Sequence, residues 1–485
     1  MFSNVRYRPL VLTFLTIVLL LLLSIFDSSF IILNKKFKSF NILSDIFISH
    51  KKSYYKPRND SILTKNNPYI DFYNYDSIYI TNKQIAKNYN LYDSNNIASY
   101  NSYYNFKPLI NFYKSLLETE KTGKKTRIAY FGDSMIEGDL ITQTIRELLQ
   151  QRFGGYGVGF VPVATNTVNS RITIFQDFSN NWKILPFNKK DLGNKLFGIS
   201  GYVYNPSILK SNGYNKDEIS WIHFKASTIS SRLSKFHSVK LYYGISNHIN
   251  YIDFEANKKR YKLSIDGNDY VNELTLNLKE PANDIYFRFY THNNINIYGV
   301  SFESNSGVFV DNYSFRGSNG LSLMNIPAEI IRGFYNYMKY NMVVLHYGLN
   351  VSDPNMKNFK WYEDGMVNVI NYIKENMPGA SILIVSVGDR ASKNGSSYET
   401  SPSIPLLLEA QKRAAQRTGV AFWNLFEAMG GYNSIVKWVE AKEPLANKDY
   451  AHLNYKGASI IGKNLANNIL EEYYTYKSII TEKSE

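Results

Sequence analysis

Residues 127–138, RIAYFGDSMIEG, hold the end of an alternating apolar run, a Gly-Asp-Ser turn and the start of a helix-like pattern. The run predicts a strand that ends at Gly132. Ser134 follows on a glycine-containing turn. A serine on a glycine-containing turn at the end of a strand is where a nucleophile would be presented to a substrate. Ser134 is therefore our first candidate for a reactive group.

The C-terminal part of the chain alternates strand patterns with helix patterns. Buried-type strands are predicted at residues 342–347, 382–387 and 420–425, and helices with one apolar face at residues 366–377, 406–417 and 460–469. Strands that alternate with helices indicate a parallel sheet covered on both faces. In such sheets the site lies at the carboxyl ends of the strands, where each candidate residue below is also found.

Between these two parts, residues 166–311 show a different pattern. Short β-type runs recur without a long amphipathic helix, and Asp266-Gly267 is a hairpin turn signal between two of them. We predict an all-β module, a sandwich, inserted into the α/β fold. The sequence leaves open whether this module binds substrate or only shapes the cleft.

The N-terminus predicts a membrane anchor. Residues 9–33 are mostly apolar and long enough to span a bilayer, and no small-residue cleavage site follows them. Residues 1–8 are short and basic, which favours a cytoplasmic N-terminus and an extracytoplasmic remainder. Residues 34–105, rich in Tyr and Asn, are predicted to be a spacer.

Composition excludes several kinds of site. The chain has 485 residues, a net charge of +14 and no cysteine, so disulfides, thiolate metal sites and a cysteine nucleophile are excluded. The basic residues are scattered and no nucleic-acid motif accompanies them. There is no HExxH and no cluster with ligand spacing, so we expect no metal, no cofactor and no nucleic-acid partner.

A serine nucleophile needs a base, a group that orients the base, and donors for an oxyanion. Of the seven histidines, His452 lies in a loop before a helix with Asp449 three residues upstream. Asn350 follows a predicted strand and carries an amide donor. Gly320 offers an unhindered N–H, and Gly317 in the same loop is the alternative.

In chain order, GDS at 132–134, GSNG at 317–320, YGLN at 347–350 and DYAH at 449–452 resemble the four blocks of the SGNH (GDSL) hydrolase family. The resemblance implies a flavodoxin-like three-layer α/β/α domain formed by residues 106–165 and 312–485. It also implies a nucleophile (Ser134), a base (His452) with its orienting carboxylate (Asp449), and an oxyanion hole (the Ser134 and Gly320 N–H groups and the Asn350 side chain).

Members with an insert after the first block resemble the peptidoglycan O-acetyl esterases. The resemblance implies a serine esterase that removes acyl, mainly acetyl, groups from peptidoglycan or another envelope polysaccharide. The methionine after Ser134 and the valine after Asn350 depart from the usual blocks, and the second departure suggests a different substrate pocket. An O-acyltransferase with the same triad and a non-catalytic glycan-binding protein stay open as alternatives.

Overall fold

The computed structural model describes residues 107–165, 170–188, 196–209 and 218–482, and two short strands near the N-terminus. The chain divides into two compact units, residues 1–72 and 73–485. In the first unit, β1 (Phe30–Ile32) and β2 (Lys35–Phe37) pair antiparallel. Apart from these strands, the predicted anchor at 9–33 and spacer at 34–105 lie outside the described residues. Within the described ranges, no helix combines the length and apolar character needed to cross a membrane.

The second unit is built around a five-stranded parallel sheet with the order β15-β3-β16-β17-β20. Its strands are β3 (Thr126–Gly132), β15 (Val308–Ser314), β16 (Met342–His346), β17 (Ser381–Val385) and β20 (Ala421–Trp423). Every residue of β3, β16 and β17 is buried. Burial on both faces explains why β16 and β17 are nearly continuous apolar runs in the sequence, whereas β3 begins with Thr126 and the buried Arg127. The predicted mixed α/β fold with a parallel sheet is confirmed.

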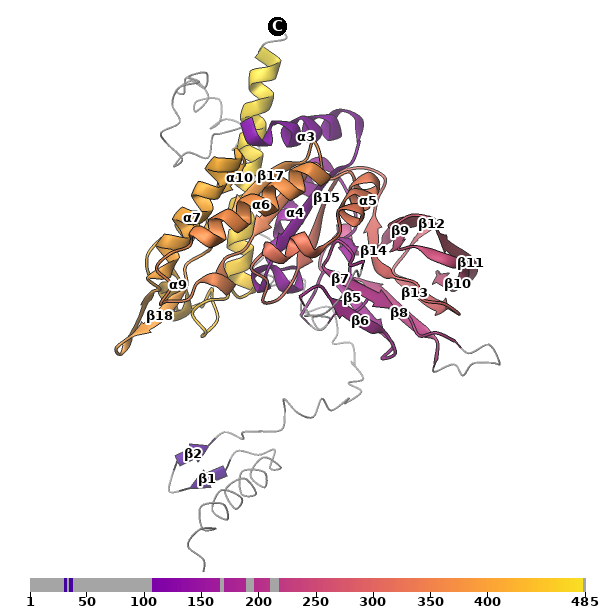
Figure 1. The fold of residues 1–485 in the computed structure, drawn as a ribbon, viewed down its shortest axis with the longest axis horizontal. Helices are drawn as coiled ribbons and strands as arrows, with labels where there is room; N and C mark the ends of the chain where they lie inside the picture. The colour runs from indigo at the N-terminus through magenta and orange to yellow at the C-terminus, as the bar shows by residue number, and fades with distance from the viewer. Residues whose placement is uncertain are drawn as a thin grey trace, which may run out of the picture. The chain divides into compact units, whose positions relative to one another are not determined.

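Helices cover both faces of this sheet. They are α3 (Ile110–Thr122), α4 (Thr142–Phe153), α5 (Ala328–Met338), α6 (Lys360–Asn376), α7 (Ser403–Thr418), α8 (Leu425–Ala428), α9 (Ser434–Glu440) and α10 (Tyr455–Glu482). Helix α6 packs on α7, and α10 packs on α4 (Figure 1). Right-handed crossovers put α4 and α6 on opposite faces, because the chain moves in opposite directions along the sheet after β3 and after β16.

Between β3 and β15, the described residues include eleven strands, which form two antiparallel sheets. One has the order β11 (Lys259–Gly267), β10 (Ser246–Ala256), β13 (Asp284–Tyr290), β8 (Ser220–Ala226) and β5 (Ile174–Phe178). The other has the order β12 (Asn272–Ala282), β9 (Phe236–Tyr243), β14 (Ile297–Glu303), β7 (Tyr202–Asn205) and β6 (Lys183–Pro186), with β4 (Gly159–Val161) paired to β14. Side chains from both sheets share one buried cluster.

The second antiparallel sheet also packs against the parallel-sheet domain. On β9, Leu241 faces the cluster between the antiparallel sheets, whereas its neighbour Tyr242 belongs to the core of the α/β domain. This alternation is the two-residue period of a strand. Because both faces of the sheet are covered, β14 is buried along its whole length.

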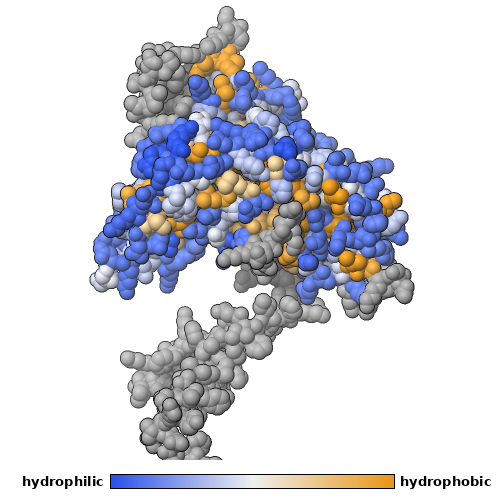
Figure 2. Space-filling model, viewed as in Figure 1, coloured by the Kyte–Doolittle hydropathy of each residue, from blue (hydrophilic) through white to orange (hydrophobic). Residues whose placement is uncertain are grey.

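A buried ion-pair network joins the two parts. Arg127 of β3 donates from Nε to Asp311 Oδ2 of β15 over 2.6 Å and from Nη2 to Ser301 Oγ over 2.7 Å. Its Nη1 also contacts Glu303 at the end of β14. The network holds the start of the strand that leads to Ser134. On the surface, hydrophilic residues are the most common among the coloured residues of the face shown in Figure 2, with apolar residues scattered between them.

Candidate active site

The candidate residues lie where the connections of two neighbouring parallel strands leave in opposite directions. Strand β3 ends at Gly132 and β16 at His346, and these two residues are register partners. The chain after β3 leads to α4 and the chain after β16 leads to α6, on opposite faces of the sheet. Such a switch point leaves a crevice beyond the carboxyl ends of the strands. Ser134 follows β3 and Asn350 follows β16, so both are placed at this crevice.

Ser134, His452 and Asp449 form a chain of hydrogen bonds. Ser134 begins the 3₁₀ helix η3 (Ser134–Asp139), and its Oγ lies 2.8 Å from His452 Nε2. His452 Nδ1 lies 2.7 Å from Asp449 Oδ2. These are the contacts that let an imidazole take a proton from a serine hydroxyl while a carboxylate fixes the tautomer of the ring. The structure thus brings together three residues spread over more than 300 positions.

The DYAH loop holds its own carboxylate in place. Asp449 Oδ1 accepts hydrogen bonds from the backbone N–H groups of Ala451, over 3.1 Å, and His452, over 3.0 Å. Burial raises the pKa of Asp449, but these bonds and the His452 ring outweigh burial, so the pKa lies below its usual value. The carboxylate is therefore ionised and stabilises a positive charge that forms on the imidazole.

The two other predicted oxyanion donors both contact Ser318. Asn350 Nδ2 donates to the Ser318 carbonyl oxygen over 2.9 Å, and the Gly320 N–H donates to Ser318 Oγ over 3.1 Å. Gly320 has φ +88°, and a Cβ there would lie 2.7 Å from the Tyr347 ring, so only glycine fits. The structure places both donors in one network beside Ser134. To bind a substrate oxygen, each donor must give up its hydrogen bond to Ser318 and form one to that oxygen.

The network includes Asp133, which we did not single out in the sequence. Asp133 Oδ2 accepts from Asn350 Nδ2 over 3.2 Å, and Oδ1 accepts from the Met135 N–H over 3.0 Å. Burial raises the pKa of Asp133 to about 6, although the Met135 N–H, the nearby His452 and the Asn350 amide lower it. Asp133 therefore positions Asn350 and the turn that carries Ser134.

The raised pKa of Asp133 predicts that the contribution of this residue to stability becomes more favourable on acidification. Because the folded-state pKa lies above the unfolded value, the cost of burying the charge is fully present above pH 6 and is lost as the pH falls towards 4. Between pH 7 and pH 4.5 the wild type should gain roughly 2 kcal/mol relative to Asp133→Asn. Urea unfolding of both proteins at the two pH values measures this difference, and equal pH dependence would contradict it.

The chain after Ser134 is fixed by a second buried group, Asp139, at the end of η3. Its carboxylate accepts from both terminal nitrogens of Arg146 on α4, over 2.6 and 2.8 Å. The hydroxyls of Thr142 and Thr173 donate to it over 2.6 Å each, and Arg171 lies 3.4 Å away. Burial raises the pKa of Asp139, but the two guanidinium groups outweigh burial and the pKa is strongly lowered. The cluster ties the serine turn to α4 and to the segment before β5.

Replacing Asp139 by asparagine should destabilise the fold by roughly 3–5 kcal/mol, because Arg146 keeps its charge in the interior without a counter-ion. Asparagine has a similar volume and tolerates the φ of +70° found at Asp139, so backbone strain is not the cause. Denaturant unfolding at pH 7 measures the loss. Asp269→Asn, at an exposed position, is the matched control and should change the stability little.

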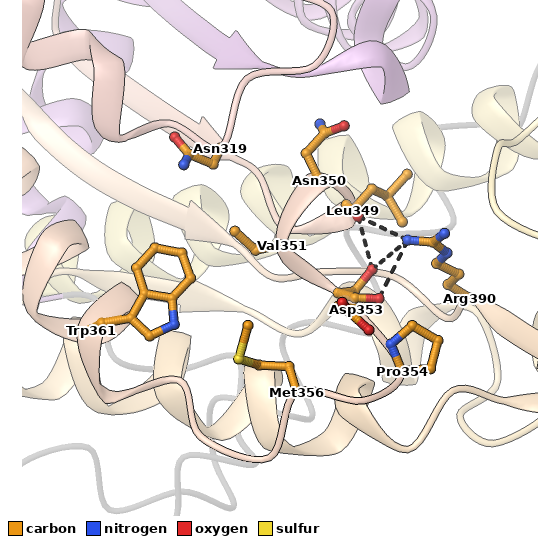
Figure 3. A pocket seen from close by; sticks show the side chains of 10 residues that line it. Asn319, Leu349, Asn350, Val351, Asp353, Pro354, Met356, Trp361 and Arg390 are labelled. Atoms are coloured by element: carbon orange, nitrogen blue, oxygen red, sulfur yellow. Dashed lines mark hydrogen bonds between the residues drawn. The ribbon is translucent and has the colours of Figure 1, made fainter.

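A cavity of about 630 Å³ adjoins the network (Figure 3). It is lined by Asn319, Leu349, Asn350, Val351, Ser352, Asp353, Pro354, Met356, Trp361 and Arg390. Arg390 Nη1 donates to the Leu349 carbonyl oxygen over 3.1 Å and to Ser352 Oγ over 3.0 Å. Arg390 therefore fixes the loop that carries Asn350. Sequence reasoning missed Arg390, since an arginine after a strand is ordinary on a protein surface.

Among the residues that the structure describes, the other histidines do not join this hydrogen-bonded chain. His346 is buried in β16, where Tyr130 OH lies 3.1 Å from its Nδ1 and burial lowers its pKa to about 3. It is a neutral core residue, as its position in an apolar strand predicts. His223, His237 and His248 lie on strands of the antiparallel sheets, and His292 follows β13. His50 lies outside the described residues.

Comparison with known proteins finds a solved structure with a similar fold. No family model and no curated protein matches the chain. A solved structure of a peptidoglycan O-acetylesterase is similar, with a TM-score of 0.62 and 21% sequence identity over 77% of this chain and 98% of that chain. Coverage of nearly all of that chain shows that the fold is shared beyond the parallel sheet.

Other similar structures have low TM-scores. A lipase/acylhydrolase from Enterococcus faecalis has a TM-score of 0.26 at 13% identity, over 34% of this chain and 76% of that chain. A family two carbohydrate esterase from Cellvibrio japonicus has a TM-score of 0.25 at 7% identity, over 62% and 99%. The fold of this chain is similar to that of the peptidoglycan O-acetylesterase, which agrees with the fold that the four short sequence blocks predict.

Proposed function

We propose that the protein is a serine esterase that removes acyl groups, mainly acetyl, from peptidoglycan or a related envelope glycan. The observation that carries the proposal is the hydrogen-bonded chain Ser134–His452–Asp449 at the switch point of the parallel sheet. The shared fold with a peptidoglycan O-acetylesterase supports the choice of substrate class.

The proposed reaction has two halves. Ser134 Oγ attacks the ester carbonyl while His452 Nε2 takes the hydroxyl proton, and the negative charge on the carbonyl oxygen is stabilised by N–H donors. Collapse of this intermediate breaks the bond to the sugar oxygen, which receives the proton from His452. Water then attacks the acyl-serine while the same imidazole takes one of its protons. The second tetrahedral intermediate collapses, the bond between the acyl carbon and Ser134 Oγ breaks, and His452 returns the proton to Oγ as acetate is released.

The oxyanion donors in this proposal are the Ser134 and Gly320 N–H groups and the Asn350 amide. Gly320 and Asn350 both donate to Ser318 in the structure. Binding of the ester therefore replaces two internal hydrogen bonds by bonds to the oxyanion. The Asn350 side chain would keep its hydrogen bond to Asp133 while its other N–H turns to the oxyanion, so Asp133 holds this donor in position as the charge develops.

We also propose the location and domain arrangement that the sequence predicts. Residues 9–33 would anchor the chain in a membrane, with the remainder outside the cytoplasm. The segment predicted at residues 166–311, ending where β15 begins at Val308, would form a β module inserted into the hydrolase domain. An envelope glycan as substrate agrees with this location. Protease treatment of cells that express a C-terminally tagged full chain tests the location, with intact cells, cells whose outer envelope is opened, and fully lysed cells. We expect the tagged domain to be cleaved once the outer envelope is opened. Protection of the domain until the cells are fully lysed would contradict an extracytoplasmic location.

The activity is tested with the full-length protein and O-acetylated peptidoglycan, measuring released acetate. We expect acetate from the wild type and none above background from Ser134→Ala. Adding a soluble glycan acceptor distinguishes the transferase, which would give an acetylated acceptor in place of acetate. Binding to the glycan without either product would favour the non-catalytic alternative and contradict the proposal.

A further inference from the structure

We infer that the cavity beside Asn350 is a saccharide subsite, with the indole of Trp361 as the surface on which a sugar ring stacks. This inference rests on the proposed function and adds to it the residues that recognise the glycan. The subsite would hold the sugar unit that carries the ester, or the unit next to it, while the acyl group reaches Ser134.

The position of the cavity is the first argument. Asn350 belongs both to its lining and to the network at Ser134, through its contact with Asp133. Asn319, beside the predicted oxyanion donor Gly320, lines the cavity as well. A molecule in the cavity therefore borders the groups that would bind the ester carbonyl. A volume of about 630 Å³ falls in the range of roughly 300–1,000 Å³ that small-ligand pockets occupy.

The chemistry of the lining is the second argument. The Trp361 side chain is 47% exposed at the second residue of α6, and its ring packs edge-on against Tyr362. In Figure 3 the indole and the Arg390 guanidinium lie on opposite sides of the cavity, with Val351 and Met356 between them. A sugar ring has an apolar C–H face and a rim of hydroxyls, so it needs an aromatic surface together with polar groups at the edge.

The polar side of the cavity supplies such groups. The exposed Asp353 has one carboxylate oxygen bonded to the Asn355 N–H, and its second oxygen is an acceptor for a sugar hydroxyl. Arg390 is held by Nη1, which makes all of its side-chain hydrogen bonds among the described residues. Its remaining N–H groups are donors for hydroxyl or amide oxygens. Because Asp353 and Arg390 have opposite charges, the lining fits a neutral saccharide such as an N-acetylhexosamine.

Trp361→Ala tests the subsite through a ratio of activities. We expect kcat/KM for O-acetylated peptidoglycan, divided by kcat/KM for a small chromogenic acetyl ester, to fall roughly ten-fold, mainly through KM of the glycan. Trp361→Phe should recover part of the ratio because a smaller ring still stacks. Tyr432→Ala removes an aromatic side chain that is 62% exposed and does not line the cavity, and the ratio should stay unchanged. Circular dichroism checks that each variant is folded.

A binding measurement separates this inference from the proposed activity. The Ser134→Ala protein should bind a tetramer of N-acetylglucosamine, seen by calorimetry, and adding Trp361→Ala should weaken that binding roughly ten-fold. If the wild type releases no acetate but this binding and its loss are observed, the esterase proposal fails and the subsite stands. If acetate is released while Trp361→Ala changes neither the ratio nor the binding, the subsite is wrong and the esterase proposal stands.

Discussion

Ser134→Ala is expected to lower kcat for ester hydrolysis by roughly four to six orders of magnitude, to the level left by the oxyanion donors and binding alone. Alanine removes only the Oγ atom that lies 2.8 Å from His452 Nε2, so no acyl-enzyme can form. KM should change little, because the hydroxyl is not needed for substrate binding. Steady-state kinetics with a chromogenic acetyl ester and with O-acetylated peptidoglycan measure the effect.

Two further variants complete this test. Ser397→Ala, at an exposed serine in the hairpin after β17, is the matched control and should retain wild-type activity. The double variant Ser134→Ala/His452→Ala should be no slower than Ser134→Ala, because the two side chains act as a unit. Additive losses, or substantial turnover by Ser134→Ala, would show that the reaction does not use this pair.

Asp449→Asn is expected to lower kcat by roughly three to four orders of magnitude while the loop keeps its shape. The asparagine oxygen can still accept from the N–H groups of Ala451 and His452, as Asp449 Oδ1 does. Its amide nitrogen would then face His452 Nδ1 and donate to it. The imidazole must take the tautomer with its proton on Nε2, which faces Ser134 and can no longer accept the serine proton.

The change should appear in kcat and in the rate of acylation seen by stopped flow, and not in thermal stability. Asp269→Asn controls for the loss of a carboxylate elsewhere. A loss of less than ten-fold for Asp449→Asn would mean that another group orients His452, and the assignment of Asp449 would be wrong.

The sequence was informative where the residues that interact are close in the chain or have strong local patterns. Asp449 and His452 are three residues apart, so their pairing follows from one short loop. The apolar runs that form β16 and β17 are buried on both faces, so their local sequence is enough to predict strands. The position of Ser134 after β3 follows from the same kind of pattern.

Features set by distant contacts were missed. Strand β15 (Val308–Ser314) pairs with β3 and crosses the predicted boundary between residues 311 and 312, because nothing local distinguishes it from the preceding β-type runs. Asp139 is polar at a turn and has an ordinary local pattern. Its burial as a charged group depends on contacts with Arg146 of α4 and with Thr173. Thr173 lies just before β5, so this contact forms only once the antiparallel sheets are in place. The contacts of Ser318 with both oxyanion candidates also depend on how two loops meet.

The most direct test of the account is to locate the acyl group during turnover. The full-length protein is mixed with O-acetylated peptidoglycan, quenched with acid within milliseconds, digested and examined by mass spectrometry. We predict one added acetyl group on the peptide that contains Ser134, present in the quenched wild type and absent from Ser134→Ala. Acetate release without any acetylated Ser134 peptide, or an acetyl group on another side chain that still turns over, would contradict the account.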